Sequence, residues 1–188
     1  QIPNYTMQQI ELTYRRSNEL LNNWNKLDGL RDDEAIKSFR IQNAIEQAFK
    51  PYSDNQQKLS RERKEIMKEI QDEVERRKKN GDKEVDDIEV RQDPRSGMVT
   101  MENIPDDLED KYRPQIKDIV REIDDMMTKK ETVEFDPLTR KDLEEHDMVN
   151  GKIFRLFKEI LDPSILEPSS NGSDEDDKPQ KEAADEED

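Results

Sequence analysis

Residues 33–79 read DEAIKSFRIQNAIEQAFKPYSDNQQKLSRERKEIMKEIQDEVERRKK, and this stretch decides the fold. Its apolar side chains recur at helical spacing, at Ile36, Phe39, Ile45, Phe49, Tyr52, Leu59, Ile66 and Ile70. That pattern is typical of a long amphipathic helix, about 70 Å in length at ~1.5 Å per residue. Because Pro51 removes one helical hydrogen bond, we expect two helices or one helix bent near Lys50.

A shorter amphipathic segment precedes the long one. Apolar residues repeat over Met7–Leu27, which predicts a helix that ends at Asp28-Gly29. Residues 1–81 are therefore expected to form an antiparallel helical hairpin. Polar Gln56 and Arg63 interrupt the heptad seam of the long segment, which favours pairing within the chain over a strong coiled-coil zipper. Association with further copies of the chain stays open.

The aromatic residues Trp24, Phe49 and Tyr52 are expected to fill the seam of this hairpin. Such rings can also form a stacking platform for nucleic-acid bases, but their helical spacing is more typical of helix packing. The basic run at 76–79 likewise allows two interpretations. It is either a nucleic-acid patch or a helix end whose cations complement the helix dipole, and the second interpretation is favoured in so acidic a chain.

The pattern changes over 82–104. Two short runs rich in β-branched residues flank Asp93-Pro94-Arg95-Ser96-Gly97, which predicts a β-hairpin or an extended insertion. A lone hairpin is marginally stable in water, so we expect it to lean on the helices or on a partner.

Residues 105–166 are expected to hold a third helix, a short strand and a terminal helix. The third helix begins near Pro105 and carries an apolar stripe that includes Tyr112 and Ile116. Residues 131–135 alternate like a strand that ends with Phe135. A final helix over 152–161 holds the densest apolar cluster, including Phe154, Phe157 and Ile160. This cluster is expected either to cap the helices or to dock on a partner.

Residues 167–188 differ in composition from the rest. From Asn171 onward they hold nine acidic residues against two lysines, and so supply seven of the sixteen net negative charges. A disordered acidic tail is predicted. Ser173 stands before four acidic residues and is a regulatory candidate, because phosphorylation would add further negative charge.

Composition supports a mainly α fold, elongated as a helical hairpin or small bundle. Only 30% of the residues are hydrophobic and 43% are charged, so the chain cannot bury a thick central core. The net charge of −16 disfavours direct binding to nucleic acid or to an anionic membrane. No signal peptide or membrane span is visible, which predicts a soluble intracellular protein.

The sequence offers little catalytic machinery, and no enzymatic activity, metal or cofactor is expected. There is no cysteine, and His146 is the only histidine. It stands in the polar stretch Glu144-Glu145-His146-Asp147, where a solvated loop residue is a more typical role than a general base or metal ligand. No phosphate-binding glycine loop and no EF-hand pattern is present.

The order of elements resembles a group of small helical proteins encoded by tailed bacteriophages and prophages. The matching stretches are Ile45-Glu46-Gln47-Ala48-Phe49-Lys50-Pro51-Tyr52 and Thr132-Val133-Glu134-Phe135-Asp136-Pro137-Leu138. The resemblance covers most of Met7 to Leu161, whereas the acidic segment 174–188 departs from that group's pattern. It implies a structural or accessory role in a phage and no particular activity.

These observations favour a non-catalytic protein that binds other proteins within an assembly, such as a structural or accessory component of a phage. One alternative is an acidic chaperone or adaptor for basic proteins such as histones. Another is a DNA mimic that inhibits a DNA-binding defence enzyme. The expected compartment is the host cytoplasm or the virion for a phage protein, and the nucleus for a eukaryotic chaperone.

Overall fold

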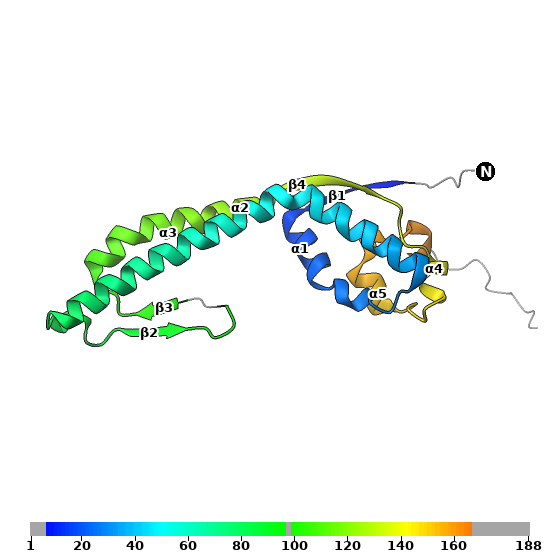
Figure 1. The fold of residues 1–188 in the computed structure, drawn as a ribbon. Coiled ribbons are helices and arrows are strands. Elements are labelled where there is room, and N and C mark those ends of the chain that lie inside the picture. Colours follow the sequence, from blue (N-terminus) through cyan, green and yellow to red (C-terminus); the bar gives the residue numbers. More distant parts are fainter. Residues whose placement is uncertain (1–6, 97–98, 167–188) are drawn as a thin grey trace, which may run out of the picture.

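The structure is a computed structural model that describes residues 7–96 and 99–166 (Figure 1). The chain is mainly helical, as the periodicity predicts, and two small antiparallel strand pairs accompany the helices. Among the described residues, no helix is both long and apolar enough to cross a membrane. The predicted acidic tail at 167–188, with Ser173, lies outside the described residues.

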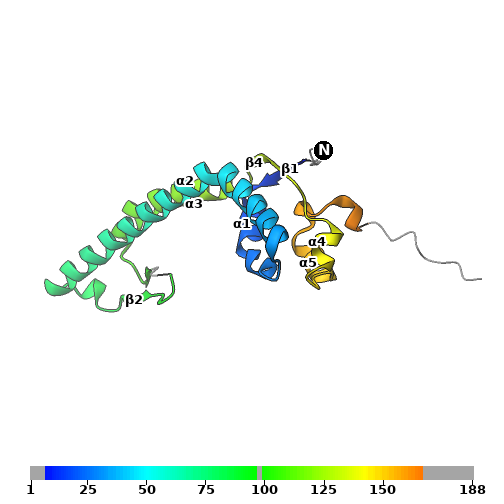
Figure 2. The same cartoon turned by 45° about the vertical axis from the view of Figure 1, so that its right-hand side comes forward.

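The longest element is α2 (Asp32–Lys79), which runs for 48 residues and continues through Pro51. It bends in the cyan stretch that includes this proline, and the same arc is visible after rotation (Figures 1 and 2). A proline lacks the amide hydrogen and crowds the preceding turn, so a helix that continues through it bends. One bent helix is therefore present, and not two.

The N-terminal part of the chain departs from the predicted helix. Where the pattern predicts one helix over Met7–Leu27, the structure has β1 (Gln8–Thr13), α1 (Tyr14–Asn22) and a 3₁₀ turn (Trp24–Leu27). β1 pairs antiparallel with β4 (Lys130–Phe135), a strand that the alternating pattern does predict.

Strand pairing explains this departure. Ile10 and Leu12 alternate with polar residues, and Ile10 stands directly opposite Val133 of β4. An available partner strand satisfies the backbone groups of β1 across the ladder, so tertiary context overrides a weak helical pattern. The chain then turns into α1, where the Thr13 hydroxyl accepts a hydrogen bond from the backbone N–H of Arg16 at 3.1 Å.

The second half of α2 packs against α3 (Asp106–Met127), which runs antiparallel to it (Figure 1). At one end Asn55 donates a hydrogen bond to Glu122 at 3.3 Å, and at the other Arg77 contacts Asp107 at 2.5 Å. The long helix thus has a different main partner from the one predicted, because α1 has only nine residues.

Residues 82–104 contain the second strand pair. β2 (Glu89–Gln92) and β3 (Val99–Glu102) are antiparallel, with Val90 opposite Met101. The buried side chains of Val85 and Ile88 anchor the chain just before β2. We call residues 53–79 of α2 together with β2, β3 and α3 the arm.

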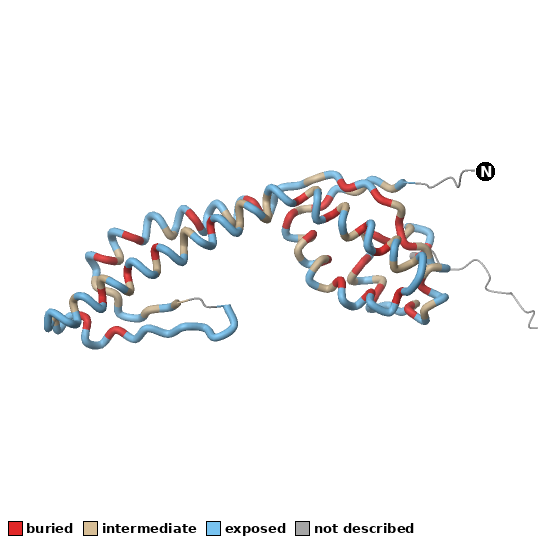
Figure 3. Tube along the Cα trace, viewed as in Figure 1, coloured by how far each residue is buried: buried red, intermediate tan, exposed pale blue. Residues whose placement is uncertain are grey.

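The other end of the molecule, which we call the base, consists of residues 32–50 of α2 with β1, α1, β4, α4 (Arg140–Glu144) and α5 (Gly151–Leu156). Buried residues line the inner faces of both the base and the arm (Figure 3). The predicted terminal helix is shorter than expected and continues as a 3₁₀ turn at Lys158–Ile160. Phe157 and Ile160 are fully buried, so this apolar cluster completes the core of the base.

Replacing Phe157 with alanine should test this role of the cluster. We expect Phe157→Ala to lower the free energy of unfolding by about 3–5 kcal/mol, because it leaves a cavity in a closed core. Phe39→Ala is the matched control, since Phe39 is 65% exposed. Urea unfolding followed by circular dichroism measures both variants, and equal midpoints would contradict the assignment.

Candidate functional site

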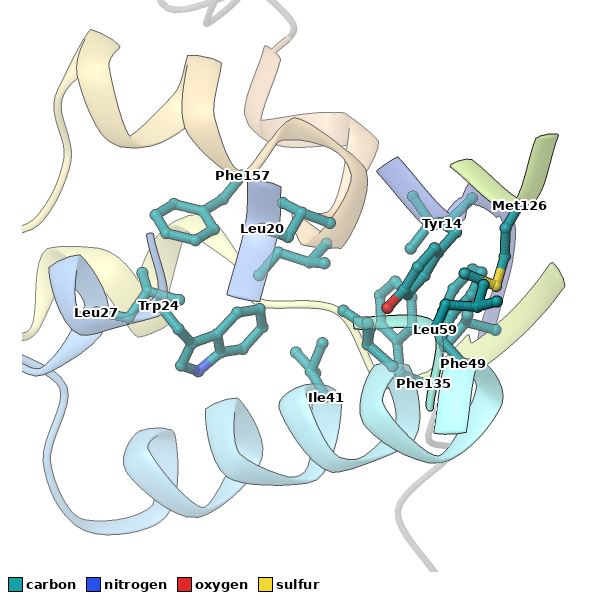
Figure 4. Close-up of a cluster of buried hydrophobic side chains, with 14 of the residues drawn as sticks. Tyr14, Leu20, Trp24, Leu27, Ile41, Phe49, Leu59, Met126, Phe135 and Phe157 are labelled. Atoms are coloured by element: carbon teal, nitrogen blue, oxygen red, sulfur yellow. The ribbon is translucent and has the colours of Figure 1, made fainter. Parts of the chain in front are cut away.

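The aromatic residues expected in one seam lie in two separate clusters of the base (Figure 4). Trp24 packs edge-on against Phe157, with ring centroids 5.8 Å apart. Phe49 and Tyr52 instead stack on Tyr14, at centroid distances of 5.8 Å and 5.6 Å. These rings are packed among protein groups, which favours the interpretation as helix packing over a stacking platform for bases.

Both tyrosines of the second cluster make long-range hydrogen bonds. The Tyr14 hydroxyl donates to Oε1 of Gln56 at 2.5 Å, and the Tyr52 hydroxyl donates to Oε1 of Glu131 at 2.7 Å. The carboxylate of Glu131 raises the pKa of Tyr52 through this bond. The cluster therefore ties α1 and β4 to the bend of α2, and Tyr14 is a central residue that the predicted seam omitted.

The remaining predicted contact residues are spread over the molecule. Tyr112 and Ile116 lie on α3 in the arm, where they line a depression of about 350 Å³ with Ile70 of α2. Phe135 is buried at the end of β4, and Phe154 is half-buried on α5. The structure thus brings Trp24 and Phe157 together but does not gather the predicted set at one surface.

His146 lies next to the first turn of α2. Its Nε2 atom is 3.3 Å from Oε2 of Glu34, and Glu145 completes a group whose ligand atoms lie within 4.8 Å of one another. In the described part of the chain this is the one such group of three histidine or acidic side chains. Nitrogen and carboxylate oxygen are donors that zinc accepts. The same contact is also an ion pair between α2 and the residues after α4 when His146 is protonated.

The two carboxyl groups of this cluster influence each other. Hydrogen bonds from its own backbone amide, from Glu145 and from His146 lower the pKa of Glu34. The hydrogen bond with Glu34 raises the pKa of Glu145, because protonated Glu145 is its donor, and repulsion between the two carboxylates adds to this effect. The cluster contains no nucleophile, and no further side chain is positioned to act together with its histidine and acids. Its geometry therefore does not define a catalytic site.

An exposed apolar patch is present on the base. Ile36 and Phe39 are 51% and 65% exposed on neighbouring positions of α2, and we call these two residues the α2 patch. The same stretch of α2 also contributes to a depression of about 310 Å³, lined by Met7, Lys37, Arg40, Ile41, Glu134, Phe135 and Asp136. Met7 is itself 50% exposed. Three of the five large hydrophobic side chains that are exposed in the described residues thus belong to this region.

The sequence pattern includes Ile36 and Phe39 among the apolar residues of the helix but does not assign them to the seam, which begins at Ile45. Ile36 and Ile45 are nine residues apart, which is two and a half helical turns at 3.6 residues per turn. Their side chains therefore point in opposite directions, and Ile45 is fully buried. The angular offset between Ile36 and Ile45 can be calculated from the sequence, and it is the signal that identifies the patch.

The basic run at the end of α2 is held by local carboxylates. Arg76 and Arg77 bind Glu73 at 2.6 Å and 3.0 Å, and Arg77 also binds Asp107 at the start of α3. The two arginines lower the pKa of Glu73 to about 2, and Arg77 lowers the pKa of Asp107. Lys78 donates to the carbonyl of Ile88 at 3.1 Å. These contacts support the interpretation of the run as a helix end and not as a nucleic-acid patch.

Comparisons with protein-family models, with curated proteins and with solved structures give no match to this chain.

Replacing Arg77 should weaken the junction of α2 with α3 in a pH-dependent way. Carboxyl groups with a lowered pKa stabilise the fold above their ordinary pKa, and this contribution is lost as the pH falls. We expect Arg77→Gln to melt at a lower temperature than the wild type at pH 7. The difference should shrink between about pH 4.5 and about pH 2, the ordinary and folded pKa values of Glu73.

Thermal melts followed by circular dichroism across this range measure the difference. Lys79→Gln is the control at the same helix end, because no ion pair of Lys79 is present among the described residues. A gap between wild type and Arg77→Gln that stays constant down to pH 2 would contradict the assigned role.

Proposed function

We propose that this chain is a non-catalytic helical protein that binds another protein within a larger assembly, and that the α2 patch is its main contact. The observation that carries the proposal is the exposure of Ile36 and Phe39 on a well-supported helix. An exposed aromatic residue beside an aliphatic one is typical of the energetic centre of a protein interface.

The surroundings of the patch support this function. Lys37 on the same helix binds Asp142 at 2.8 Å and Asp136 at 3.7 Å, which fixes α2 to the residues around α4. Trp24 adds a hydrogen bond from Nε1 to the Ser38 hydroxyl at 3.2 Å. The patch is therefore carried by a helix whose inner face is held by packing and by polar contacts. A rigid contact surface loses less conformational entropy when a partner binds.

The rest of the molecule agrees with an assembly role. The arm extends away from the base, so the two ends can contact different components (Figure 1). The resemblance to small helical proteins of tailed phages favours a structural or accessory component. This proposed role makes the partner a protein and requires no cofactor.

The double variant Ile36→Ser/Phe39→Ser should test the proposal. We expect recovery of the partner to fall by roughly tenfold or more, because residues at the centre of an interface each contribute about 2 kcal/mol or more. Stability should change little, since both side chains are exposed. The measurement is quantitative mass spectrometry of proteins cross-linked to the tagged chain in its native source.

Val120→Ser is the matched control, because Val120 is 41% exposed but lies on the arm. Multi-angle light scattering of wild type and variants tests whether the partner is a second copy. The proposal fails if the folded double variant retains the same cross-linked proteins as the control.

A further inference from the structure

From Ser53 to Gln71, one face of α2 holds no acidic residue, although the whole chain carries 48 of them. Two adjoining depressions, of about 360 Å³ and 670 Å³, lie along this face and share Ser60 and Lys64 in their walls. We call them together the arm groove. Its α2 wall includes Arg61, Lys64 and Lys68, and no aspartate or glutamate of the described residues lines either depression.

Charge is segregated around this part of the helix. The acidic residues Asp54, Glu62 and Glu65 belong to the same turns of α2 but are absent from the walls of the groove. Two lysines of α2 outside the groove have local partners, as Lys50 binds Asp54 at 3.1 Å and Lys58 approaches Glu62 at 3.9 Å. Such separation of opposite charges on one helix indicates a surface that meets an anionic partner.

The floor of the groove provides a second observation. Met67 of α2, Val99 of β3 and Ile123 of α3 form an apolar floor beneath the cations. The Nε atom of Arg63 is buried there without a hydrogen-bond partner in the described residues. A buried donor without a partner costs free energy that an anionic or carbonyl ligand would recover.

We propose that the arm groove binds the acidic segment 174–188 of the same chain. This segment has nine acidic side chains against two lysines, and Ala183 and Ala184 stand among the acids. Carboxylates would contact Lys64, Lys68 and the guanidinium of Arg63, while the two small apolar residues cover the floor. A free nucleic acid is a weaker candidate, because it must overcome the repulsion of an acidic chain without the tether that holds segment 174–188 near the groove.

The length of the chain allows this contact. Leu161 pairs with Leu138, and Asp136, two residues before Leu138, contacts Lys37 at 3.7 Å. The distance along α2 from Lys37 to Lys64 is about 40 Å at ~1.5 Å per residue. Residues 167–181 can span up to about 50 Å at ~3.3 Å per residue, so the segment reaches the groove with its end, from Glu182 onward. Tethering also raises the effective concentration of the segment at the groove to about the millimolar range.

The bound segment would cover the arm groove until another acidic ligand displaces it. This role is separate from the α2 patch, which lies on the base. The contact would thus regulate access to a second surface and does not depend on the proposed function.

A spin label on segment 174–188 tests the contact in the full-length protein. Because the chain has no cysteine, Ala184→Cys provides a single labelling position and keeps every charge. We expect paramagnetic broadening of backbone amide signals at Ser60, Lys64 and Lys68, and none at Phe39. Raising the salt from ~0.1 M to ~1 M shortens the screening length from ~10 Å to ~3 Å and should remove the broadening.

Charge reversal identifies the groove as the binding surface. Lys64→Glu/Lys68→Glu should reduce the broadening roughly tenfold, the size expected when several weak exposed ion pairs are reversed together. Lys50→Glu/Lys58→Glu is the matched control, with the same charge change at two lysines of α2 that do not line the groove, and should leave the broadening in place. Circular dichroism confirms that both variants are folded.

Three outcomes would overturn the proposal. Broadening spread evenly over the surface, or unchanged by Lys64→Glu/Lys68→Glu, would mean that the segment does not bind the groove. Broadening that appears only between labelled and isotope-enriched copies in a mixture would assign the contact to a second copy of the chain. If a duplex oligonucleotide binds at the groove and no bound segment is displaced from it, the groove belongs to nucleic acid.

Discussion

Burial of one face of α2 is the interaction on which the rest of the structure depends. A 48-residue helix in a chain with so few hydrophobic residues cannot be covered by a single partner element. In the base, Ile41, Ile45 and Phe49 are buried, whereas in the arm Ile66, Ile70 and Val74 are buried. The bend near Pro51 separates these two stretches, so each is covered by a different group of elements (Figures 1 and 3). The fold is thus one thin, continuous core that follows α2 through both parts of the molecule.

The sequence was sufficient to predict the local elements of this fold. A repeat of three to four residues depends only on neighbours along the helix, so α2 and α3 follow from it, and the bend follows from the chemistry of proline. The pairing of β1 with β4 could not be predicted in this way. Gln8 and Phe135 are distant in the chain, and their ladder is fixed by backbone hydrogen bonds that leave little trace in composition. Met7, Ile10 and Tyr14 also fit a helical repeat, which made the wrong element plausible.

The surface was harder to predict than the core for a physical reason. An apolar residue in a stripe is buried only if a partner element reaches it, and the partner is set by tertiary structure. Phe39 and Phe49 are the same residue type on the same helix, yet they are 65% and 2% exposed. The density of apolar residues at Phe157 and Ile160 suggested a docking surface as readily as a core, and their complete burial decides between the two. The arm groove was equally hard to predict from the sequence, because α2 is rich in both acidic and basic residues.

The positions of these features set apart the one cluster of titratable groups from the two distinctive surfaces of α2. Catalysis requires reactive groups held close together in a shielded place. Among the described residues, the one convergence of histidine and acids is Glu34 with Glu145 and His146, where Glu145 is exposed to solvent. The distinctive surfaces are instead far apart along α2, with the apolar patch at Phe39 and the cationic groove at Lys64. A helix is stiff along its axis, so these two surfaces cannot act on one small substrate. They suit contacts with two different macromolecular segments, which the shared helix holds at a fixed separation.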